Sequence, residues 1–237
     1  MLRRIPFEHL KNLRDLGGFP AGKTHVTRWG ICYRSNLPEN LTEEEKQWLL
    51  AQGVTTIIDL RNAGERQRRP NCLEPDPRFR YCNFSMYEDG ASVNMGDPEG
   101  KQQVGKFYLD MLGSTPAPVQ ALRSILNAPG GVLFHCSAGK DRTGLIGALL
   151  LLLAGVADDD IIADYQVSYT YMRDYALAMA EVNPDRPAYI YHSDPDFMRD
   201  FLAAFRARYG TVEAYLKANG FEDRDVETLR EKLREPM

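Results

Sequence analysis

An apolar strand pattern at the centre of this chain runs through a short polar loop directly into an apolar helix pattern. Gly130 and Gly131 precede the run Val132–His135, and residues 145–156 read LIGALLLLLAGV. The second run is too short to cross a bilayer, because a membrane-spanning helix takes about 20 apolar residues. We therefore interpret the two runs as a strand and a buried helix that follows it.

Strand and helix patterns alternate through the first half of the chain. The β-branched run at residues 54–60 predicts a buried strand, and residues 79–86 predict another. Thr42 and Glu45 have the spacing of a capping box, which starts a helix that Gly53 ends. Further helices are predicted at Phe107–Leu112, at Val119–Asn127 and from Thr143 onward.

This alternation predicts an α/β fold, in which helices flank a central, mostly parallel sheet. Helices dominate the part of the chain at 143–237, so extra C-terminal helices are expected. Two apolar helix faces are formed there by Phe197, Phe201, Leu202 and Phe205, and by Val226, Leu229 and Leu233. A length of 237 residues fits one domain, and we assign 1–237 to it.

Composition narrows the classes of function. Hydrophobic residues make up 43% of the chain and charged residues 26%, as in globular proteins. A net charge of −4 disfavours a dedicated nucleic-acid binder, and four cysteines are too few for a disulfide framework. The N-terminus lacks the apolar core of a signal peptide. A reducing cytoplasm is the simplest setting, and a leaderless secretion route stays open.

Two charged or polar stretches are predicted to connect these elements. Residues 61–77 contain prolines and indicate a surface connection, whose arginines either meet an acidic substrate or lie in solvent. These are Arg61, Arg66, Arg68 and Arg69. Residues 87–104 predict a long polar loop, and such loops are either functional lids or disordered. We take 87–112 as a candidate lid.

The segment between the central strand and the long helix carries the candidate chemistry. It reads HCSAGKDRTG over residues 135–144, with cysteine and arginine in the spacing C-x5-R. A loop that closes onto a helix N-terminus points backbone N–H groups into a concavity that binds an anion. Gly139 permits close backbone approach, and Arg142 supplies a planar fork for two phosphate oxygens. The candidate phosphate-binding residues are Ser137, Ala138, Gly139, Lys140, Asp141 and Arg142.

The same positive environment favours a thiolate at Cys136 over a thiol. We predict that this sulfur attacks phosphorus in line and forms a covalent phosphocysteine. Thr143 is expected to donate its hydroxyl to the sulfur, and His135 to hydrogen-bond the backbone of the loop. A cysteine after a buried strand is usually a small core residue, and we keep that interpretation for Cys32, Cys72 and Cys82.

The segment HCSAGKDRTG resembles the signature loop of the protein tyrosine phosphatase superfamily. Other segments resemble its mostly bacterial branch, which includes mycobacterial and listerial phosphatases acting on phosphotyrosine and phosphoinositides. These are Asn12-Leu-Arg-Asp-Leu-Gly-Gly18, Tyr33-Arg-Ser35 and Ile58-Asp-Leu-Arg61, with Lys140-Asp141 in the loop. The resemblance covers roughly residues 10–175. It implies a central sheet flanked by helices, and activity without a metal or another cofactor.

A lysine and an aspartate within the loop are typical of that branch. The resemblance implies that Lys140 adds positive charge at the pocket mouth, which favours multiply phosphorylated substrates. A solvated loop charge is the alternative. Asp141 either braces the loop or carries a proton, because a carboxylate beside a phosphate is repulsive unless it is protonated or turned away.

The general acid stays open among several aspartates. Ester cleavage needs a proton for the leaving oxygen, and later a base for the attacking water. In the superfamily an aspartate on a mobile loop upstream of the signature does this, which makes Asp89 the first candidate by topology. Asp141 is the second and Asp59, at a strand end, is the third, with a supporting structural role as its alternative. Asp97 is a weaker candidate.

Together these observations predict a phosphoric monoester hydrolase of the protein-tyrosine-phosphatase type. Its expected substrate is a phosphotyrosine protein, with dual specificity included, and a phosphoinositide or inositol phosphate is the alternative. Intact Cys136 and Arg142 disfavour a pseudophosphatase that only binds phosphate. Thr143 and Gly144 fit a phosphatase better than a sulfurtransferase. No oligomeric state follows from the sequence.

Overall fold

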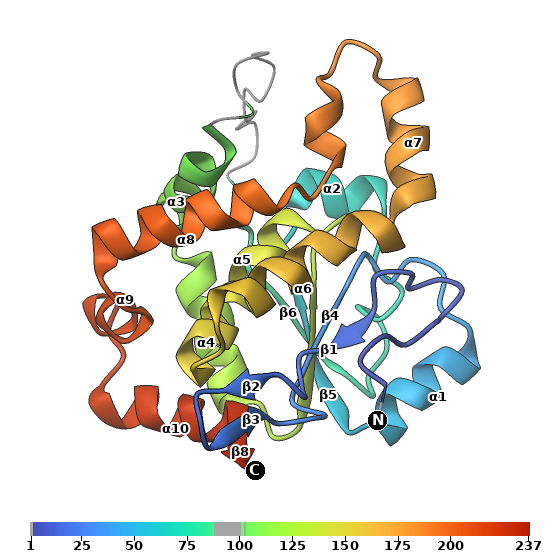
Figure 1. Cartoon of the computed structure of the whole chain (residues 1–237). Coiled ribbons are helices and arrows are strands. Elements are labelled where there is room, and N and C mark those ends of the chain that lie inside the picture. Colours follow the sequence, from blue (N-terminus) through green and yellow to red (C-terminus); the bar gives the residue numbers. More distant parts are fainter. Residues whose placement is uncertain (1, 88–100, 102) are drawn as a thin grey trace.

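A twisted five-stranded sheet forms the centre of the computed structural model, which describes residues 2–87, 101 and 103–237 (Figure 1). The strand order is β1 (Arg14–Asp15), β4 (Cys32–Ser35), β7 (Gly131–His135), β5 (Val54–Asp59) and β6 (Arg80–Asn83). β1 pairs with β4 in the antiparallel sense, and the other three pairs are parallel. The predicted α/β fold with a mostly parallel sheet is therefore confirmed.

Alternate side chains of the central strands enter two separate hydrophobic cores, because successive residues of a strand point to opposite faces of a sheet. Ile58 and Phe134 pack into the larger core, which also contains the apolar residues of α5. Ile57 and Leu133 pack into a smaller core together with Leu49 of α1. Each fully buried side chain of this size contributes about 1.5–3 kcal/mol to folding.

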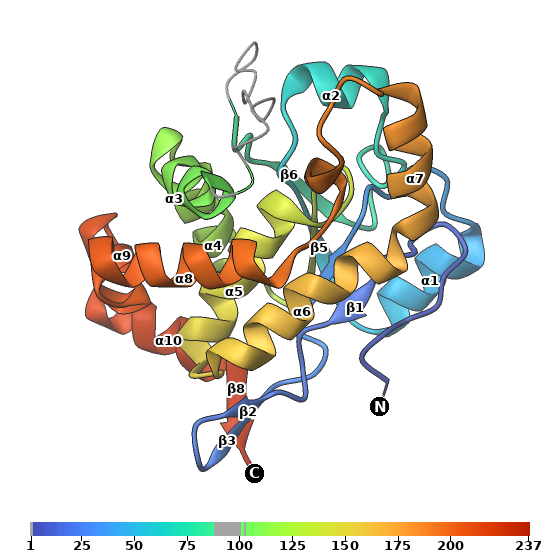
Figure 2. The ribbon, with the colours of Figure 1, turned by 45° about the horizontal axis from the view of Figure 1, so that its top comes forward.

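Ten α-helices are described around the sheet (Figure 2). They are α1 (Glu43–Ala51), α2 (Ala63–Arg68), α3 (Val104–Ser114), α4 (Ala117–Asn127), α5 (Asp141–Ala154), α6 (Asp158–Tyr171), α7 (Arg173–Val182), α8 (Pro195–Tyr209), α9 (Val212–Ala218) and α10 (Asp223–Leu233). A 3-10 helix, η2 (Ala188–Tyr191), follows α7. In the described part of the chain, no helix has the length and apolar character needed to cross a membrane.

Several helix predictions hold at the level of single residues. Thr42 and Glu45 form the predicted capping box of α1. α5 is buried along almost its whole length, begins two residues earlier than predicted, and ends at Gly155, whose φ of 94° suits glycine. Both predicted apolar faces of the C-terminal helices are buried.

Three features differ from the sequence-based expectations. Residues 61–77 are not only a surface connection, because Asn62 and Glu65 form a capping box that starts α2, and Arg61 is 1% exposed. β6 is shorter than the predicted strand at 79–86. Residues 88–100 and 102 of the predicted polar loop lie outside the described residues, and from Val104 onward the chain forms α3, which packs against α8.

A second, three-stranded sheet joins residues 20–27 to the C-terminal segment 234–236. It consists of β2 (Pro20–Ala21), β3 (His25–Thr27) and β8 (Arg234–Pro236), all antiparallel. The helical pattern of the C-terminal part gave no sign of β8. Strands this short form because a partner strand offers its backbone groups, a tertiary effect that local sequence does not encode.

Candidate active site

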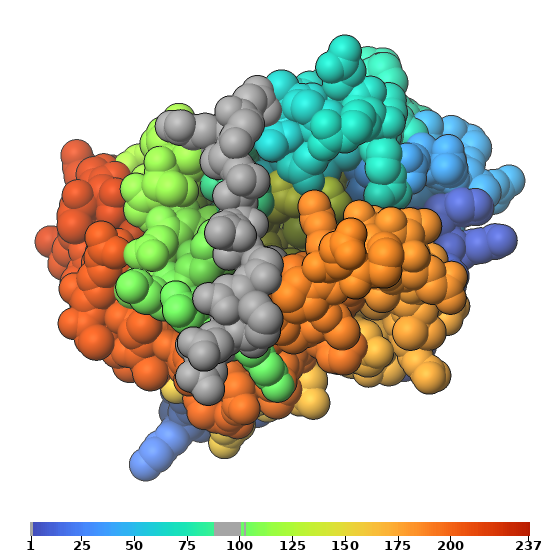
Figure 3. All heavy atoms as spheres, turned by 90° about the horizontal axis from the view of Figure 1, so that it is seen from above, coloured from blue at the N-terminus to red at the C-terminus, as the bar shows by residue number. Residues whose placement is uncertain are grey.

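The segment 135–144 lies at the carboxyl end of the central strand β7, between its neighbours β4 and β5. Ligands of open parallel sheets bind at this edge. Seen from above, the molecule is hollowed here between α2 and the segment that follows α7, and yellow-green atoms lie at the floor (Figure 3). Cys136, 3% exposed, directly follows the strand, and α5 begins at Asp141.

The backbone of this loop presents a series of unused donors. The N–H groups of residues 137–143 donate no hydrogen bond within the part of the chain that the structure describes. The last three of them belong to the open N-terminus of α5, where the helix dipole adds positive potential. Such an array suits an anion with several oxygens, for instance a phosphoryl group.

Gly139 allows the loop to press against β4. Its φ is +70°, and a Cβ atom on it would lie 2.2 Å from the carbonyl oxygen of Ser35. Only glycine fits both the backbone conformation and the contact. The tight turn predicted from the sequence is therefore present.

Two residues from the N-terminal part of the chain, Asn12 and Arg34, hold the loop from outside. The Asn12 amide donates to the carbonyl oxygens of Ala138 (2.9 Å) and Gly139 (3.1 Å). Arg34 donates to the Gly139 oxygen at 2.9 Å and forms an ion pair with Asp164 at 2.6 Å. All three side chains are buried.

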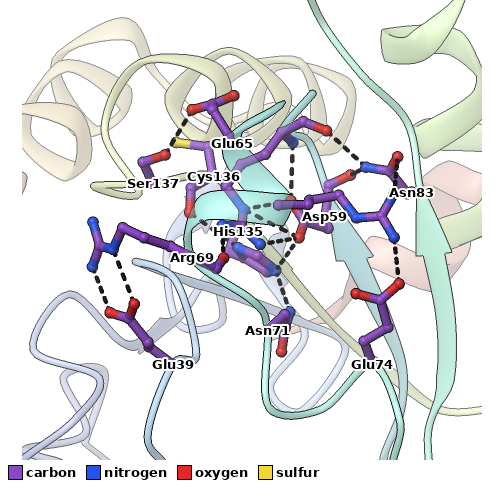
Figure 4. A network of polar contacts seen from close by, with 12 residues as sticks. Glu39, Asp59, Glu65, Arg69, Asn71, Glu74, Asn83, His135, Cys136 and Ser137 are labelled. Atoms are coloured by element: carbon purple, nitrogen blue, oxygen red, sulfur yellow. Dashed lines mark hydrogen bonds and ion pairs between the residues drawn. The ribbon is translucent and has the colours of Figure 1, made fainter. Parts of the chain in front are cut away.

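Arg142 is fixed by a carboxylate that the sequence analysis missed. Glu65 of α2 accepts two hydrogen bonds from the Arg142 guanidinium, at 2.6 and 2.8 Å, and a third from the Ser137 hydroxyl at 2.8 Å. Figure 4 shows Glu65 beside Ser137 and Cys136. The spacing of Asn62 and Glu65 signals a helix cap, but nothing in it signals a partner for an arginine 77 residues away.

The opposite charges of Glu65 and Arg142 shift the pKa of both groups toward their charged forms. Burial raises the pKa of Glu65, but the hydrogen bonds and charge of Arg142 outweigh it and bring the pKa to about 2. Burial lowers the pKa of Arg142, whereas Glu65 and the nearby Cys136 raise it above its ordinary value. The arginine thus keeps its positive charge next to the Cys136 sulfur.

His135 and its neighbours form a buried network beneath the loop (Figure 4). His135 Nδ1 lies 3.0 Å from the carbonyl oxygen of Cys136, which confirms the predicted bond to the loop backbone. Its Nε2 lies 2.8 Å from the amide of Asn71, a contact that sequence reasoning missed. Burial lowers the pKa of His135 despite the nearby Asp59 carboxylate, so the ring is neutral at pH 7.

Asp59 is held as an ion pair rather than left facing the hollow. Its carboxylate is fully buried and accepts hydrogen bonds from Arg61 and from the Tyr81 hydroxyl, the latter at 2.8 Å. Burial by itself raises the pKa of this carboxyl, but His135 and Arg61 outweigh burial and bring the pKa down to about 2. This geometry fits the supporting role that the sequence left open for Asp59.

Lys140 and Asp141 turn toward the helices that surround the loop. The Lys140 ammonium donates to the backbone oxygens of Ile190 and His192 and lies 3.3 Å from Asp141 Oδ1. Its side chain is 7% exposed, so a freely solvated charge is not what the structure shows. Asp141 accepts a hydrogen bond from the Tyr108 hydroxyl of α3, which braces the loop from that side.

The remaining predicted residues are distributed as follows. Thr143 Oγ1 is buried without a hydrogen-bond partner among the described residues, so the expected bond to Cys136 is not formed in this conformation. Asp89 and Asp97 lie outside the described residues. The predicted basic cluster is mostly paired: Arg61 with Asp59, Arg66 with Glu74, and Arg69 with Glu39. Arg68 is exposed.

A pocket adjoins the loop on the side of α6 and α7. Ala138, Lys140 and Asp141 line it on one side, and Tyr169, Met172 and Tyr175 contribute aromatic and apolar surface.

Within the residues that the structure describes, no three His, Cys, Asp or Glu side chains are grouped to hold a metal ion.

Replacing Glu65 by glutamine is expected to lower kcat/KM for an aryl phosphate on the order of tenfold, because two charge-assisted bonds to Arg142 are weakened. Glu74→Gln is the matched control, since Glu74 pairs with Arg66 away from the loop. Unchanged kinetics of Glu65→Gln would contradict the role of Glu65.

The depressed pKa of Glu65 also means that its carboxylate stabilises the fold above pH 4.5, and that this stability is lost as the pH falls toward 2.

Comparisons with known proteins show the family to which this chain belongs. The model of the tyrosine phosphatase family matches residues 5–235. A tyrosine-protein phosphatase of Nostoc commune is 35% identical over 208 residues, which are 81% of this chain and 70% of that protein. The triple specificity protein phosphatase PtpB of Mycobacterium tuberculosis is 25% identical, over 92% of this chain and 95% of its own.

Among solved structures, P. aeruginosa TpbA aligns with a TM-score of 0.45 and 17% identity, over 87% of this chain and 97% of its own. The family model and these relatives define a phosphoric monoester hydrolase of the tyrosine-phosphatase type. The chain belongs to the tyrosine phosphatase family.

Proposed function

We propose that this protein hydrolyses aryl phosphate monoesters at Cys136, with phosphotyrosine in proteins as its substrate class. The observation that supports the proposal most is the array of free N–H groups over residues 137–143, closed by an arginine that Glu65 holds in place. These donors can surround the three non-bridging oxygens of a phosphoryl group above the sulfur.

The reaction would then proceed in two displacements. In the first, the Cys136 thiolate forms a bond to phosphorus while the bond to the ester oxygen breaks, and a general acid protonates the leaving oxygen. In the second, a base removes a proton from water, the water oxygen attacks phosphorus, and the thiolate leaves. Arg142 and the backbone donors stabilise the charge on the equatorial oxygens in both steps.

The aromatic lining of the pocket beside the loop supports an aryl substrate. Tyr169 and Tyr175 offer ring surface to a flat aromatic group that enters next to Ala138. The relative PtpB is named a triple specificity phosphatase, which is why we include dual specificity. The four cysteines are free thiols, and a reducing cytoplasm is the setting that we propose.

A phosphoinositide phosphatase is the second candidate, and it depends on the positive charge of Lys140. In this structure that charge is engaged by two backbone oxygens and by Asp141. The test is a parallel turnover screen of phosphotyrosine peptides, phosphoserine peptides and phosphoinositides. Preference for the phosphoinositide would reverse the order of the two candidates, and absence of turnover on all three would refute the proposed function.

The general acid is proposed to be Asp89 or Asp141, and aspartate-to-asparagine variants at 89, 141 and 59 distinguish them. The true acid's variant should lose the basic limb of the pH–rate profile and about 10²–10⁴-fold in rate. The loss should shrink for a nitrophenyl phosphate, whose leaving group needs little protonation. Asp59→Asn should lower stability without removing that limb, because Asp59 is committed to Arg61. If no variant loses the limb, the acid lies elsewhere.

A further inference from the structure

The carbonyl groups of three successive loop residues are all held from outside the loop. The Ser137 oxygen accepts a hydrogen bond from the N–H of Leu37 at 3.0 Å. The Ala138 oxygen accepts from Asn12, and the Gly139 oxygen accepts from both Asn12 and Arg34. The external donors thus come from β4, from Leu37 just after it, and from the segment before β1.

The orientation of each carbonyl determines the orientation of the next N–H. In a trans peptide the C=O and N–H bonds point in opposite directions, and the described chain has no cis peptide. Pinning the oxygens of Ala138 and Gly139 outward therefore turns the N–H groups of Gly139 and Lys140 to the opposite side. Among the described residues, these two N–H groups have no other hydrogen-bond partner.

The rotamer of the Asn12 amide is fixed by its own partners. Its Oδ1 accepts a hydrogen bond from Arg14 Nη1 at 2.6 Å, and Arg14 is held by Asp164 at 2.7 Å. A flipped amide would place its NH₂ against the guanidinium and its oxygen against two carbonyl oxygens, which the donor inventory forbids. Two N–H donors therefore face the loop.

We propose that Asn12 is a positioning residue of the phosphate-binding loop, which turns the Gly139 and Lys140 N–H groups toward the substrate phosphoryl group. Arg34 assists from the far side of the Gly139 oxygen. Asn12 itself does not touch substrate. This inference rests on the proposed function, because it assigns those N–H groups to the oxygens of a phosphoryl group.

The substitution Asn12→Asp tests it with little change in shape. The carboxylate keeps the contact to Arg14 but loses both donors and faces two carbonyl oxygens. We expect kcat for an aryl phosphate to fall about 10²-fold or more, with a smaller change in KM, because such donors act most strongly in the transition state. Competitive inhibition by inorganic phosphate should weaken roughly tenfold.

Asn36→Asp is the matched control. The Asn36 Oδ1 accepts a hydrogen bond from the Asn12 backbone N–H at 3.0 Å, which an aspartate would keep. Its amide N–H groups donate to the carbonyl oxygens of His9 and Leu37 and not to the loop. Asn12→Ala removes the donors without adding a carboxylate, and should show the same loss of kcat. A folded Asn12 variant with a lowered Tm but the wild-type kcat and phosphate inhibition would show a merely structural role and overturn the proposal.

Wild-type protein provides a measurement that does not depend on any variant folding. Inorganic phosphate should shift the Gly139 and Lys140 amide protons downfield in an NMR titration, and unshifted resonances at saturation would refute their assignment. If the wild type shows no turnover, the proposed function fails separately. The role of Asn12 can then still be decided by alkylation of Cys136 with and without inorganic phosphate. Phosphate should protect the wild type against the alkylating reagent more strongly than it protects Asn12→Asp.

Discussion

Cys136→Ser is expected to abolish turnover of an aryl phosphate while leaving phosphate binding in place. A serine hydroxyl is close to the thiol in size, but it is a much weaker nucleophile because it gives up its proton far less readily. Loss of the nucleophile should lower kcat on the order of 10⁴-fold or more. The measurement is steady-state turnover of nitrophenyl phosphate, together with phosphate binding by calorimetry.

Cys82→Ser is the matched control, because Cys82 lies on β6 and contacts Ser124 rather than the loop. It should retain wild-type turnover. Turnover by Cys136→Ser at more than a few per cent of the wild-type rate would refute a phosphocysteine at this position. A trapped phosphoenzyme in the wild type, absent from the variant, would supply the direct counterpart.

Arg142→Lys should be almost as damaging, although it preserves the charge. The guanidinium meets Glu65 with two parallel hydrogen bonds and still has N–H groups for a phosphoryl group. An ammonium offers a single point of contact and cannot satisfy both partners in one plane. We expect kcat/KM to fall about 10³-fold or more, through both a higher KM and a lower kcat.

Arg66→Lys is the control for the arginine, since Arg66 pairs with Glu74 and Asn83 at a partly exposed position. Circular dichroism and Tm report whether either variant unfolds. A folded Arg142→Lys protein with kcat/KM within tenfold of the wild type would mean that the fork geometry is not needed for binding or catalysis.

Much of the chemistry could be predicted because its signals are local. A strand that ends at His135, a loop with Gly139, and a helix N-terminus at Asp141 follow one another in the chain, so their meaning does not depend on distant residues. The same holds for the capping box at Thr42 and Glu45, which involves side chains three residues apart.

The supporting residues could not be predicted because their partners are distant in sequence. Glu65 reaches Arg142, Asn12 reaches Ala138, and Asn71 reaches His135 only after the sheet has formed. A buried polar side chain must find a partner, but the sequence does not tell which one. The sequence also left Lys140 either at the pocket mouth or in solvent, whereas tertiary contacts enclose its side chain.

The position of β7 in the sheet has a consequence for biosynthesis. This strand inserts between β4 and β5, which precede it by many residues and do not pair with each other. A nascent chain therefore exposes two unpaired strand edges until the nucleophile's own strand leaves the ribosome. Chains interrupted before that point would lack the cysteine and would leave both strand edges open to pairing with other chains.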